Sequence, residues 1–378
     1  MRDLHFDLHG HSVTIGADDA DLRSYVRAHF ETEARTEPDA DLRVHATWRW
    51  GKPGPAASQD PDRAGAERVG RGLLLTRGSS PSGGSGGFGR PRAIWSRIPG
   101  FPELTLSFQL EGDGGGRLNV DASCGYEPRG MGRKLEYLRP GRAERKRNRL
   151  FFKLMYFMVY YPMAWQLERS RGWGLLHASA VAMPSGRAVI LSGLGGVGKS
   201  TLGLSLLSRP GARLLSDNLI FHDEDRIYSC PEPVRLDAAS LAGVADSGIE
   251  PERTRLPATA HPKPTYRVGP ARRALAAAPA AVYFLRFAPR SGVTRVDPER
   301  AAEMLTAGNE LAAEIKDHRP CQAVLTMLAA ESNSPPPAAR ASLSKLLAGA
   351  DCAVFRIGEG EKIAETVARL ARRLESPA

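Results

Sequence analysis

A glycine-rich stretch with one lysine and two hydroxyl residues is the part of the sequence best suited to chemistry. It has the spacing G-x-x-x-x-G-K-[ST], which is typical of a loop that holds nucleotide phosphates. Glycines let backbone N–H groups converge on phosphate oxygens without a Cβ in the way. Lys199 adds a full charge on the β- and γ-phosphates, and the Ser200 hydroxyl is a ligand for Mg²⁺. The sequence therefore predicts a nucleotide site made of Gly193, Gly195, Gly196, Val197, Gly198, Lys199, Ser200 and Thr201.

The residues on either side supply the secondary structure that such a loop needs. Residues 188–192 form a short apolar run typical of a buried strand, and the pattern after the loop predicts a helix through Leu207. That helix would begin near Lys199 and direct the positive end of its dipole at the same phosphates.

Two downstream carboxylate positions are candidates for a metal ligand or a base. Asp217 follows Leu214-Leu215-Ser216, one helix and one return strand after the loop. In a parallel sheet the carboxyl end of that strand faces the crevice that holds the phosphates. Asp223 and Glu224 follow a second apolar run and are expected, with His222, in a polar turn. We favour Asp217; its alternative role is a local cap, and use of Asp223 and Glu224 would indicate a regulatory ATPase.

These segments resemble the HPr kinase/phosphorylase group and its HPr-kinase-related relatives. The resemblance covers roughly residues 177–237: His177-Ala178-Ser179, the glycine-rich loop, the run from Arg213 to Asn218, and a strand-like segment from Cys230 to Asp237. It implies an α/β fold with a P-loop kinase domain of the phosphoenolpyruvate carboxykinase/HPr kinase type. It also implies ATP and Mg²⁺ as cofactors, and a hydroxyl acceptor on a protein, a peptide or a small molecule.

The resemblance further implies a role for each site residue. Asp217 would be the base, His177 would lie beside it and set its charge, and Lys199 would hold the triphosphate. Ser200, Asp217 and Asn218 would ligate the metal. Three positions depart from the family pattern, since Gly195, Thr201 and Asn218 stand where the family has serine, glutamate and aspartate. An asparagine carbonyl can ligate Mg²⁺ but cannot act as a base.

Other interpretations of these residues remain open on the sequence alone. A histidine in an apolar strand, such as His177, also fits a hydrogen-bonded core residue. Several basic residues further along could clamp a phosphate, and the sequence singles out none of them: Arg235, Arg253, Arg255, Lys263, Arg267, Arg272 and Arg273.

Length and pattern indicate two domains joined by a basic segment. The chain has 378 residues, of which 42% are hydrophobic and 25% are charged, as in a soluble globular protein. Period-two alternation in 4–8, 42–48 and 104–110, with a helix over 18–30, predicts that residues 1–128 form a smaller β-rich α+β domain of unknown role. Residues 129–172 would be a basic linker and a helix broken at Pro162. Residues 173–378 would be the nucleotide-binding domain. Segments 52–63 and 78–92 are expected to be flexible.

Charge and cysteine usage limit the partners. The net charge is +10, and residues 129–149 are rich in arginine and lysine. Because no aromatic residue interleaves 139–149 for base stacking, we expect a solvated linker and do not expect a nucleic-acid partner. The four scattered cysteines fit neither a disulfide framework nor a zinc site. The start lacks a signal-peptide pattern, and the longest apolar run is shorter than the ~20 residues that span a bilayer. We expect a cytoplasmic protein without membrane association; a homo-oligomer is left open.

Overall fold

The glycine-rich loop follows a central strand of a mixed sheet that helices cover on both faces. A computed structural model describes residues 3–31, 33–34, 39–50, 66–78, 89–111, 116–126, 141–332 and 336–375. The chain divides into two compact units. Unit 1 comprises Met1–Leu167 and His318–Pro337, and unit 2 comprises Glu168–Asp317 and Ala338–Ala378.

Parallel strands form the middle of the unit 2 sheet. Strand β19 (Ala276–Ala288) lies between β12 (Arg187–Ser192) and β21 (Asp351–Gly358), parallel to both. Antiparallel strands complete the sheet on either side: β10 (Gly174–His177), β11 (Ser179–Ala182), β13 (Arg213–Ser216), β14 (Leu219–His222), β15 (Ile227–Ser229) and β20 (Gly292–Arg295). The sheet is therefore mixed rather than parallel, yet β12 and β13 run in the same direction because both are antiparallel to β11.

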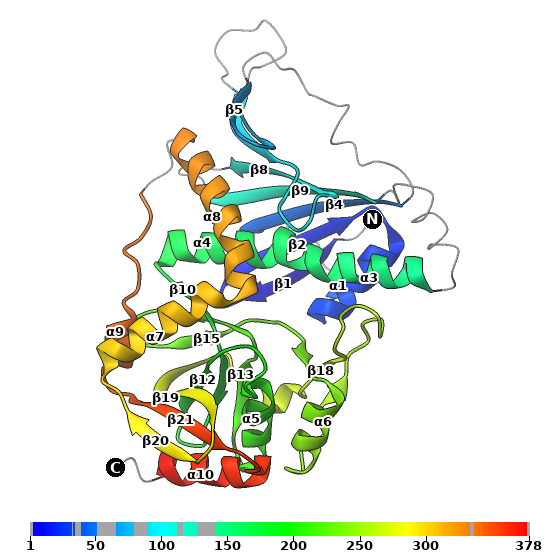
Figure 1. The fold of residues 1–378 in the computed structure, drawn as a ribbon. Helices are drawn as coiled ribbons and strands as arrows, with labels where there is room; N and C mark the ends of the chain where they lie inside the picture. Colours follow the sequence, from blue (N-terminus) through cyan, green and yellow to red (C-terminus); the bar gives the residue numbers. More distant parts are fainter. Residues whose placement is uncertain are drawn as a thin grey trace, which may run out of the picture. The chain divides into compact units, whose positions relative to one another are not determined.

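Helices cover both faces of this sheet (Figure 1). An apolar core lies between the sheet and the helices on each face. One face packs against α5 (Lys199–Ser205), α6 (Ala238–Ala245) and α10 (Ile363–Glu375), through side chains such as Leu202, Val244 and Leu370. The other face packs against α7 (Pro298–Leu311) and α9 (Leu343–Leu347), through Leu305 and Leu347. The predicted α/β class is confirmed for this part of the chain.

A small sheet of unit 2 lies between β15 and β19 in the sequence. It has the order β16 (Val234–Arg235), β18 (Thr265–Arg267), β17 (Glu252–Arg253), and a 3-10 turn, η4 (Pro270–Arg272), follows it. The segment from Cys230 to Asp237 was expected to be one strand, but only Val234 and Arg235 pair in a ladder. Two prolines, Pro231 and Pro233, cannot donate a backbone hydrogen bond, which explains why the ladder is so short.

A broad sheet with a helical cover on one face forms unit 1. Its strand order is β3-β1-β2-β4-β9-β8-β7-β6-β5, and the strands are β1 (Leu4–Leu8), β2 (His11–Ala17), β3 (Glu33–Ala34), β4 (Leu42–Trp50), β5 (Ala66–Gly70), β6 (Leu73–Gly78), β7 (Gly89–Trp95), β8 (Leu104–Glu111) and β9 (Arg117–Tyr126). Helix α1 (Ala20–Phe30) begins after Asp19, whose side chain accepts from Leu22 N. The alternating segments of the sequence thus do form strands beside a helix.

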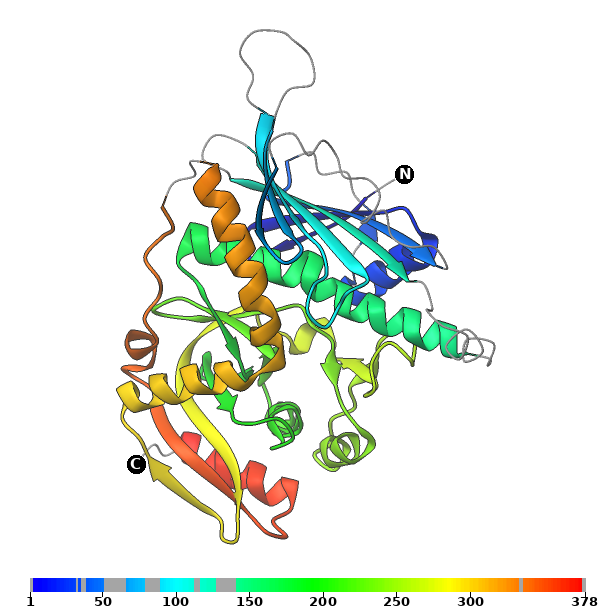
Figure 2. The same cartoon turned by 45° about the horizontal axis from the view of Figure 1, so that its top comes forward.

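A long helical segment crosses the unit 1 sheet (Figure 2). It consists of α3 (Arg142–Met155), a π-helical turn η2 (Tyr156–Tyr160) and α4 (Tyr161–Arg171). The expected break at Pro162 takes the form of this π turn just before the proline, in which Tyr161 N donates to Tyr156 O. Since Pro162 has no N–H and its ring displaces the carbonyl four residues back, the wider turn accommodates it without ending the helix.

Some sequence-based expectations fall outside the described residues. This holds for 52–63 and for most of 78–92, although residues 89–92 belong to β7. Helix α8 (Ala313–Glu331) contributes its first residues to unit 2 and the remainder to unit 1. Within the described ranges no helix has the length and apolar character needed to cross a membrane.

Candidate functional site

The glycine-rich loop connects β12 to α5 through a backbone that only glycines adopt easily. Gly193, Gly196 and Gly198 have φ of 142°, 84° and 96°. A Cβ on Gly193 would stand 2.7 Å from the Leu285 carbonyl oxygen of the neighbouring strand. A Cβ on Gly196 or Gly198 would meet no atom within 4 Å, so the loop surface there is open. Glycine is thus required by backbone conformation along the loop and by close packing at Gly193.

Lys199 begins α5 and folds its side chain back over the loop. Its ammonium donates to Gly193 O at 2.7 Å and to Leu194 O at 3.2 Å, and the residue is only 9% exposed. Burial lowers the pKa of Lys199, while the charges of Asp217 and Glu314 oppose that shift. The lysine therefore places one partly desolvated positive charge beside the open loop.

Asp217 lies in a continuous antiparallel ribbon rather than at a free strand end. Strand β10 pairs with β14, and the ladder continues through a hydrogen bond from Ala178 N to Asn218 O. Beyond it β11 pairs with β13, where Ala180 is opposite Ser216. That register places Ser179 opposite Asp217. Because β11 is also paired with β12, where Ser179 is opposite Leu191, Asp217 is level with the residues that enter the loop.

The environment of Asp217 combines burial with nearby donors. The residue is 5% exposed, and burial raises the pKa of its carboxyl group. A hydrogen bond from the Ser200 hydroxyl and the charge of Arg235 hold part of that rise back. A carboxyl group in this state is suited to accept a proton or to ligate a cation.

Asn218 connects a second carboxylate to the ribbon. Its φ is 84°, a left-handed conformation that asparagine adopts more readily than most residues. Its amide nitrogen donates to both carboxylate oxygens of Glu232, at 3.2 and 3.0 Å. Glu232 therefore supplies beside Asn218 the negative charge that an aspartate at that position would have carried.

His177 ends β10 and is half-buried. Burial and the charge of Lys199 lower the pKa of His177 to about 4, although a hydrogen bond with the Asn218 side chain acts in the opposite direction. The imidazole is neutral at pH 7 and lies within electrostatic reach of Lys199, Arg235 and Glu314.

Arg235 and Glu314 form a half-buried ion pair within the same site. Arg235 Nη2 lies 3.1 Å from Glu314 Oε1, and the two side chains are 17% and 19% exposed. Burial favours the neutral form of Glu314, but Arg235 holds the pKa of that carboxyl group below its usual value. Of the basic residues that the sequence left open, Arg235 is the one whose charge acts on His177, Lys199 and Asp217.

Asp223 and Glu224 take other roles. Asp223 accepts from Asp225 N at 2.8 Å, from Arg226 N at 2.7 Å and from the Tyr228 hydroxyl, which closes the turn between β14 and β15. Glu224 pairs with Lys345 at 3.0 Å and accepts from Ser342 N. The polar turn was predicted correctly except for His222, which is a buried strand residue.

The remaining predicted residues of the loop contribute backbone rather than side chain. Val197 is 6% exposed and belongs to the core beneath the loop, and Thr201 is 7% exposed. The structure thus brings Lys199, Ser200 and Asp217 together, with His177 and Asn218 beside them. Sequence analysis missed Glu232 and Glu314, and only the resemblance at Cys230–Asp237 pointed toward the first. Among the described residues, no three His, Cys, Asp or Glu side chains gather as a metal site would require.

The comparisons with known proteins add little. The sequence matches no protein-family model and no curated protein. One solved structure, the Hpr(Ser) kinase/phosphatase from Coxiella burnetii, aligns with 54% of this chain and 99% of its own length, at 10% identity and a TM-score of 0.24. A superposition of that quality carries no functional argument, so the inference rests on the site itself.

Proposed function

We propose that this chain is a Mg-ATP-dependent kinase that transfers the γ-phosphoryl group of ATP to a hydroxyl, with a serine of a protein or peptide as the preferred acceptor. One observation carries the proposal: the buried carboxyl group of Asp217 lies close enough to the Ser200 hydroxyl and to Lys199, beside an open glycine-rich loop, for both to lower its pKa. A base, a metal-binding hydroxyl and a phosphate-binding cation are the groups that phosphoryl transfer needs.

The residues have complementary tasks in this reaction. Loop amides and Lys199 hold the triphosphate, and Asp217 orients the acceptor hydroxyl and accepts its proton as the oxygen bonds to the γ-phosphorus. The bond from that phosphorus to the β,γ-bridging oxygen breaks, and ADP leaves. Arg235 is suited to neutralise charge on the transferred group.

The donor set fits a magnesium ion. Ser200 and Asp217 offer the hydroxyl and carboxylate oxygens that Mg²⁺ prefers, with the Asn218 carbonyl as the third candidate. A bound Mg²⁺ would neutralise charge on the phosphates. A cation would also favour the ionised form of Asp217, against the effect of burial.

Two alternatives differ in what they demand of the site. A small-molecule kinase would use the same residues with a different acceptor. A regulatory ATPase would need Asp223 and Glu224 at the metal, but these residues are engaged in a turn and with Lys345. The contacts therefore favour transfer to a hydroxyl.

The test is incubation with γ-labelled ATP, Mg²⁺ and a fractionated cell extract, followed by identification of the labelled species. Wild-type protein should label one acceptor. The Asp217→Asn variant should label it at least ~100-fold more slowly while still binding ATP, because loss of a general base typically lowers the rate by a factor of about 10²–10⁴. The transfer rate of the matched control, Asp223→Asn with Glu224→Gln, should stay within about fivefold of wild type, since these residues contact the β14–β15 turn, Ser342 and the exposed Lys345. If the control variant is inactive and the Asp217→Asn variant is active, the kinase proposal fails and the regulatory ATPase is favoured instead.

A further inference from the structure

The two ends of a bound nucleotide would lie over different strands of the sheet. At the carboxyl end of β12 the strand pairings give the order β21-β19-β12-β11-β13. Asp217 follows β13, so a γ-phosphate that reacts there must lie on the β11 and β13 side of the loop. The remainder of the nucleotide then extends toward β19 and β21, which lie about 5 and 10 Å to the side of β12 at ordinary strand spacing. Both strands continue past the end of β12, because Ser192 is opposite Phe284 and β19 ends at Ala288.

An exposed aromatic residue lies on the β19 and β21 side of the loop. Phe287 is 65% exposed and is the only aromatic among the large hydrophobic residues that the described ranges leave exposed. Along β19 it shares its face with Tyr283 and Leu285, which are buried in the core that includes α5 and α10. Leu285 itself abuts the first glycine of the loop, where a Cβ on Gly193 would meet its carbonyl oxygen at 2.7 Å. Phe287 is thus two residues beyond the strand's contact with the loop.

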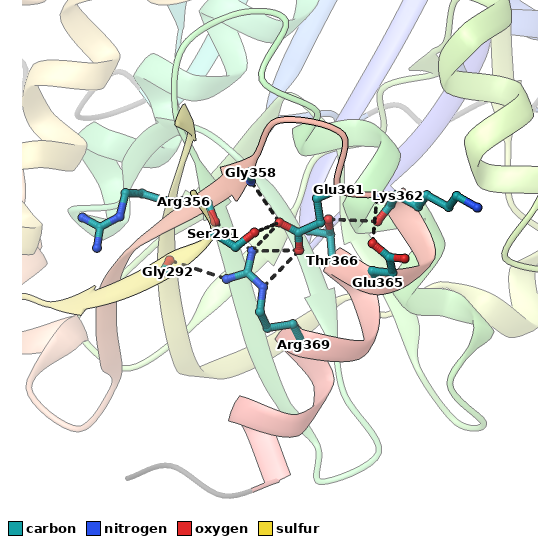
Figure 3. Close-up of polar contacts among 9 residues, drawn as sticks. All are labelled: Ser291, Gly292, Arg356, Gly358, Glu361, Lys362, Glu365, Thr366 and Arg369. Carbon is teal, nitrogen blue, oxygen red and sulfur yellow. Dashed lines mark hydrogen bonds and ion pairs between the residues drawn. The ribbon is translucent and has the colours of Figure 1, made fainter. Parts of the chain in front are cut away.

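The first turn of α10 lies beside the beginning of α5. A Cβ on Gly243 of α6 would stand 2.0 Å from Ile363 Cδ1 and 3.4 Å from Thr201 Cγ2. Ile363 and Thr201 therefore meet across Gly243, so the beginnings of α10 and α5 are neighbours. The exposed Lys362 precedes this turn and extends away from the polar network beside it (Figure 3).

That polar network fixes the connection between β19 and β20 that follows Phe287 and passes the end of β21. Glu361 accepts from Gly358 N at 2.9 Å, from the Ser291 hydroxyl and from Arg369 Nη2 at 3.0 Å (Figure 3). Arg369 also donates to Arg356 O at 2.7 Å, and its guanidinium lies 3.9 Å from the centroid of the Phe355 ring. The connection from β19 to β20, the end of β21 and the first turns of α10 are thus held together, which leaves Phe287 on a rigid support.

We infer that Phe287 is the platform on which the purine base of the bound nucleotide stacks. The inference rests on the proposed nucleotide-binding function and adds the location of the base. A flat, exposed ring on a rigid strand end, on the side of the loop away from Asp217, offers the surface that base stacking uses.

Calorimetry with two ligands tests this inference in the presence of Mg²⁺. ATP carries a base and inorganic tripolyphosphate does not, so Phe287→Ala should weaken ATP binding about tenfold, as loss of base stacking does, and leave tripolyphosphate binding within twofold. Phe287→Tyr should retain ATP affinity. The control is Leu275→Ala, since Leu275 is 71% exposed and should affect neither ligand.

The outcomes separate this inference from the proposed function. If wild-type protein binds ATP and the Phe287→Ala variant binds it equally well, or if the variant loses both ligands alike, the base does not stack on Phe287. Equal wild-type affinity for ATP and tripolyphosphate would also overturn the inference and leave the phosphate site intact. Failure of wild-type protein to bind either ligand would overturn both proposals.

Discussion

Burial sets the protonation of the site residues, and it acts on each of them in the direction of the neutral form. It raises the pKa of Asp217 and lowers those of Lys199 and His177. Opposite charges nearby limit the shifts of Asp217 and Lys199. His177 faces two cations, Lys199 and Arg235, and the charge of Glu314 opposes them only in part. We therefore expect His177 to act as a neutral hydrogen-bonding group beside the reaction and not as a second cation.

A histidine titration by NMR tests this expectation. The pKa of His177 should be about 4, well below the usual value near 6.5. Between these values the unfolded chain binds the proton more readily, so this residue's contribution to stability falls as the pH drops from about 6.5 toward about 4. The His177→Gln variant assigns the signal, which is needed because the pKa of His261 is also lowered to about 4. A His177 signal that titrates near pH 6.5 would contradict the account.

At the residue scale, sequence patterns pointed to site residues that lie within one short segment of the chain. The loop from Gly193 to Thr201 and the choice of Asp217 over Asp223 followed from spacing. Glu314 could not be found in this way, because it comes from a helix more than a hundred positions after the loop and has no motif around it. Arg235 was one of several basic candidates, and its ion pair with Glu314 is what distinguishes it from the others.

At the scale of elements, a helix completes the open edge of β10. The Asn309 side chain, from α7, accepts from His177 N at 2.8 Å and donates to Leu175 O at 3.0 Å. An asparagine amide thus takes the place that a neighbouring strand would occupy beside β10. Because His177 is one of the two bonded residues, we assign Asn309 the task of positioning it.

Replacement of Asn309 should therefore affect the rate more than nucleotide binding. In Asn309→Ala we expect kcat for phosphoryl transfer to fall about tenfold, since a small misplacement near the reacting groups costs up to ~100-fold. ATP affinity measured by calorimetry should stay within twofold, and the His177 NMR signal should move. Arg300→Ala is the control, because its ion pair with Glu303 on the same helix is exposed. Unchanged kcat, or equal losses of rate and affinity, would contradict the positioning role.

Hydrophobic periodicity was a good guide to strands but not to their pairing. Alternation at 42–48 and 104–110 marked β4 and β8 correctly, and the apolar run at 281–287 lies in the longer β19. The apolar run from Leu175 to Met183 has the pattern of a single strand, but the structure has β10 and β11 with Ala178 between them. The two strands differ in partner, since β10 pairs with β14 and β11 with β13, and pairing depends on residues too distant for a local pattern to reveal.

At the scale of the whole molecule, unit 1 combines the first 167 residues with the later segment His318–Pro337. No motif marks that return, because its apolar residues follow an ordinary helical pattern. The basic segment is engaged within unit 1 where it is described: Arg147 pairs with Asp21, and Lys146 with Glu103 at 3.8 Å. These contacts agree with a solvated helix face, while residues 129–140 lie outside the described ranges.

Both proposals depend on nucleotide binding by the intact protein, and calorimetry of Mg-ATP with wild-type protein and Lys199→Ala measures it most directly. Lys199 is the one full positive charge that hydrogen-bonds within the loop. Charge-assisted hydrogen bonds are worth about 1.5–3 kcal/mol, so the variant should bind Mg-ATP roughly 10- to 100-fold more weakly, with its circular dichroism unchanged. Equal affinity for the two proteins, or no binding by the wild type, would show that the loop does not hold a nucleotide.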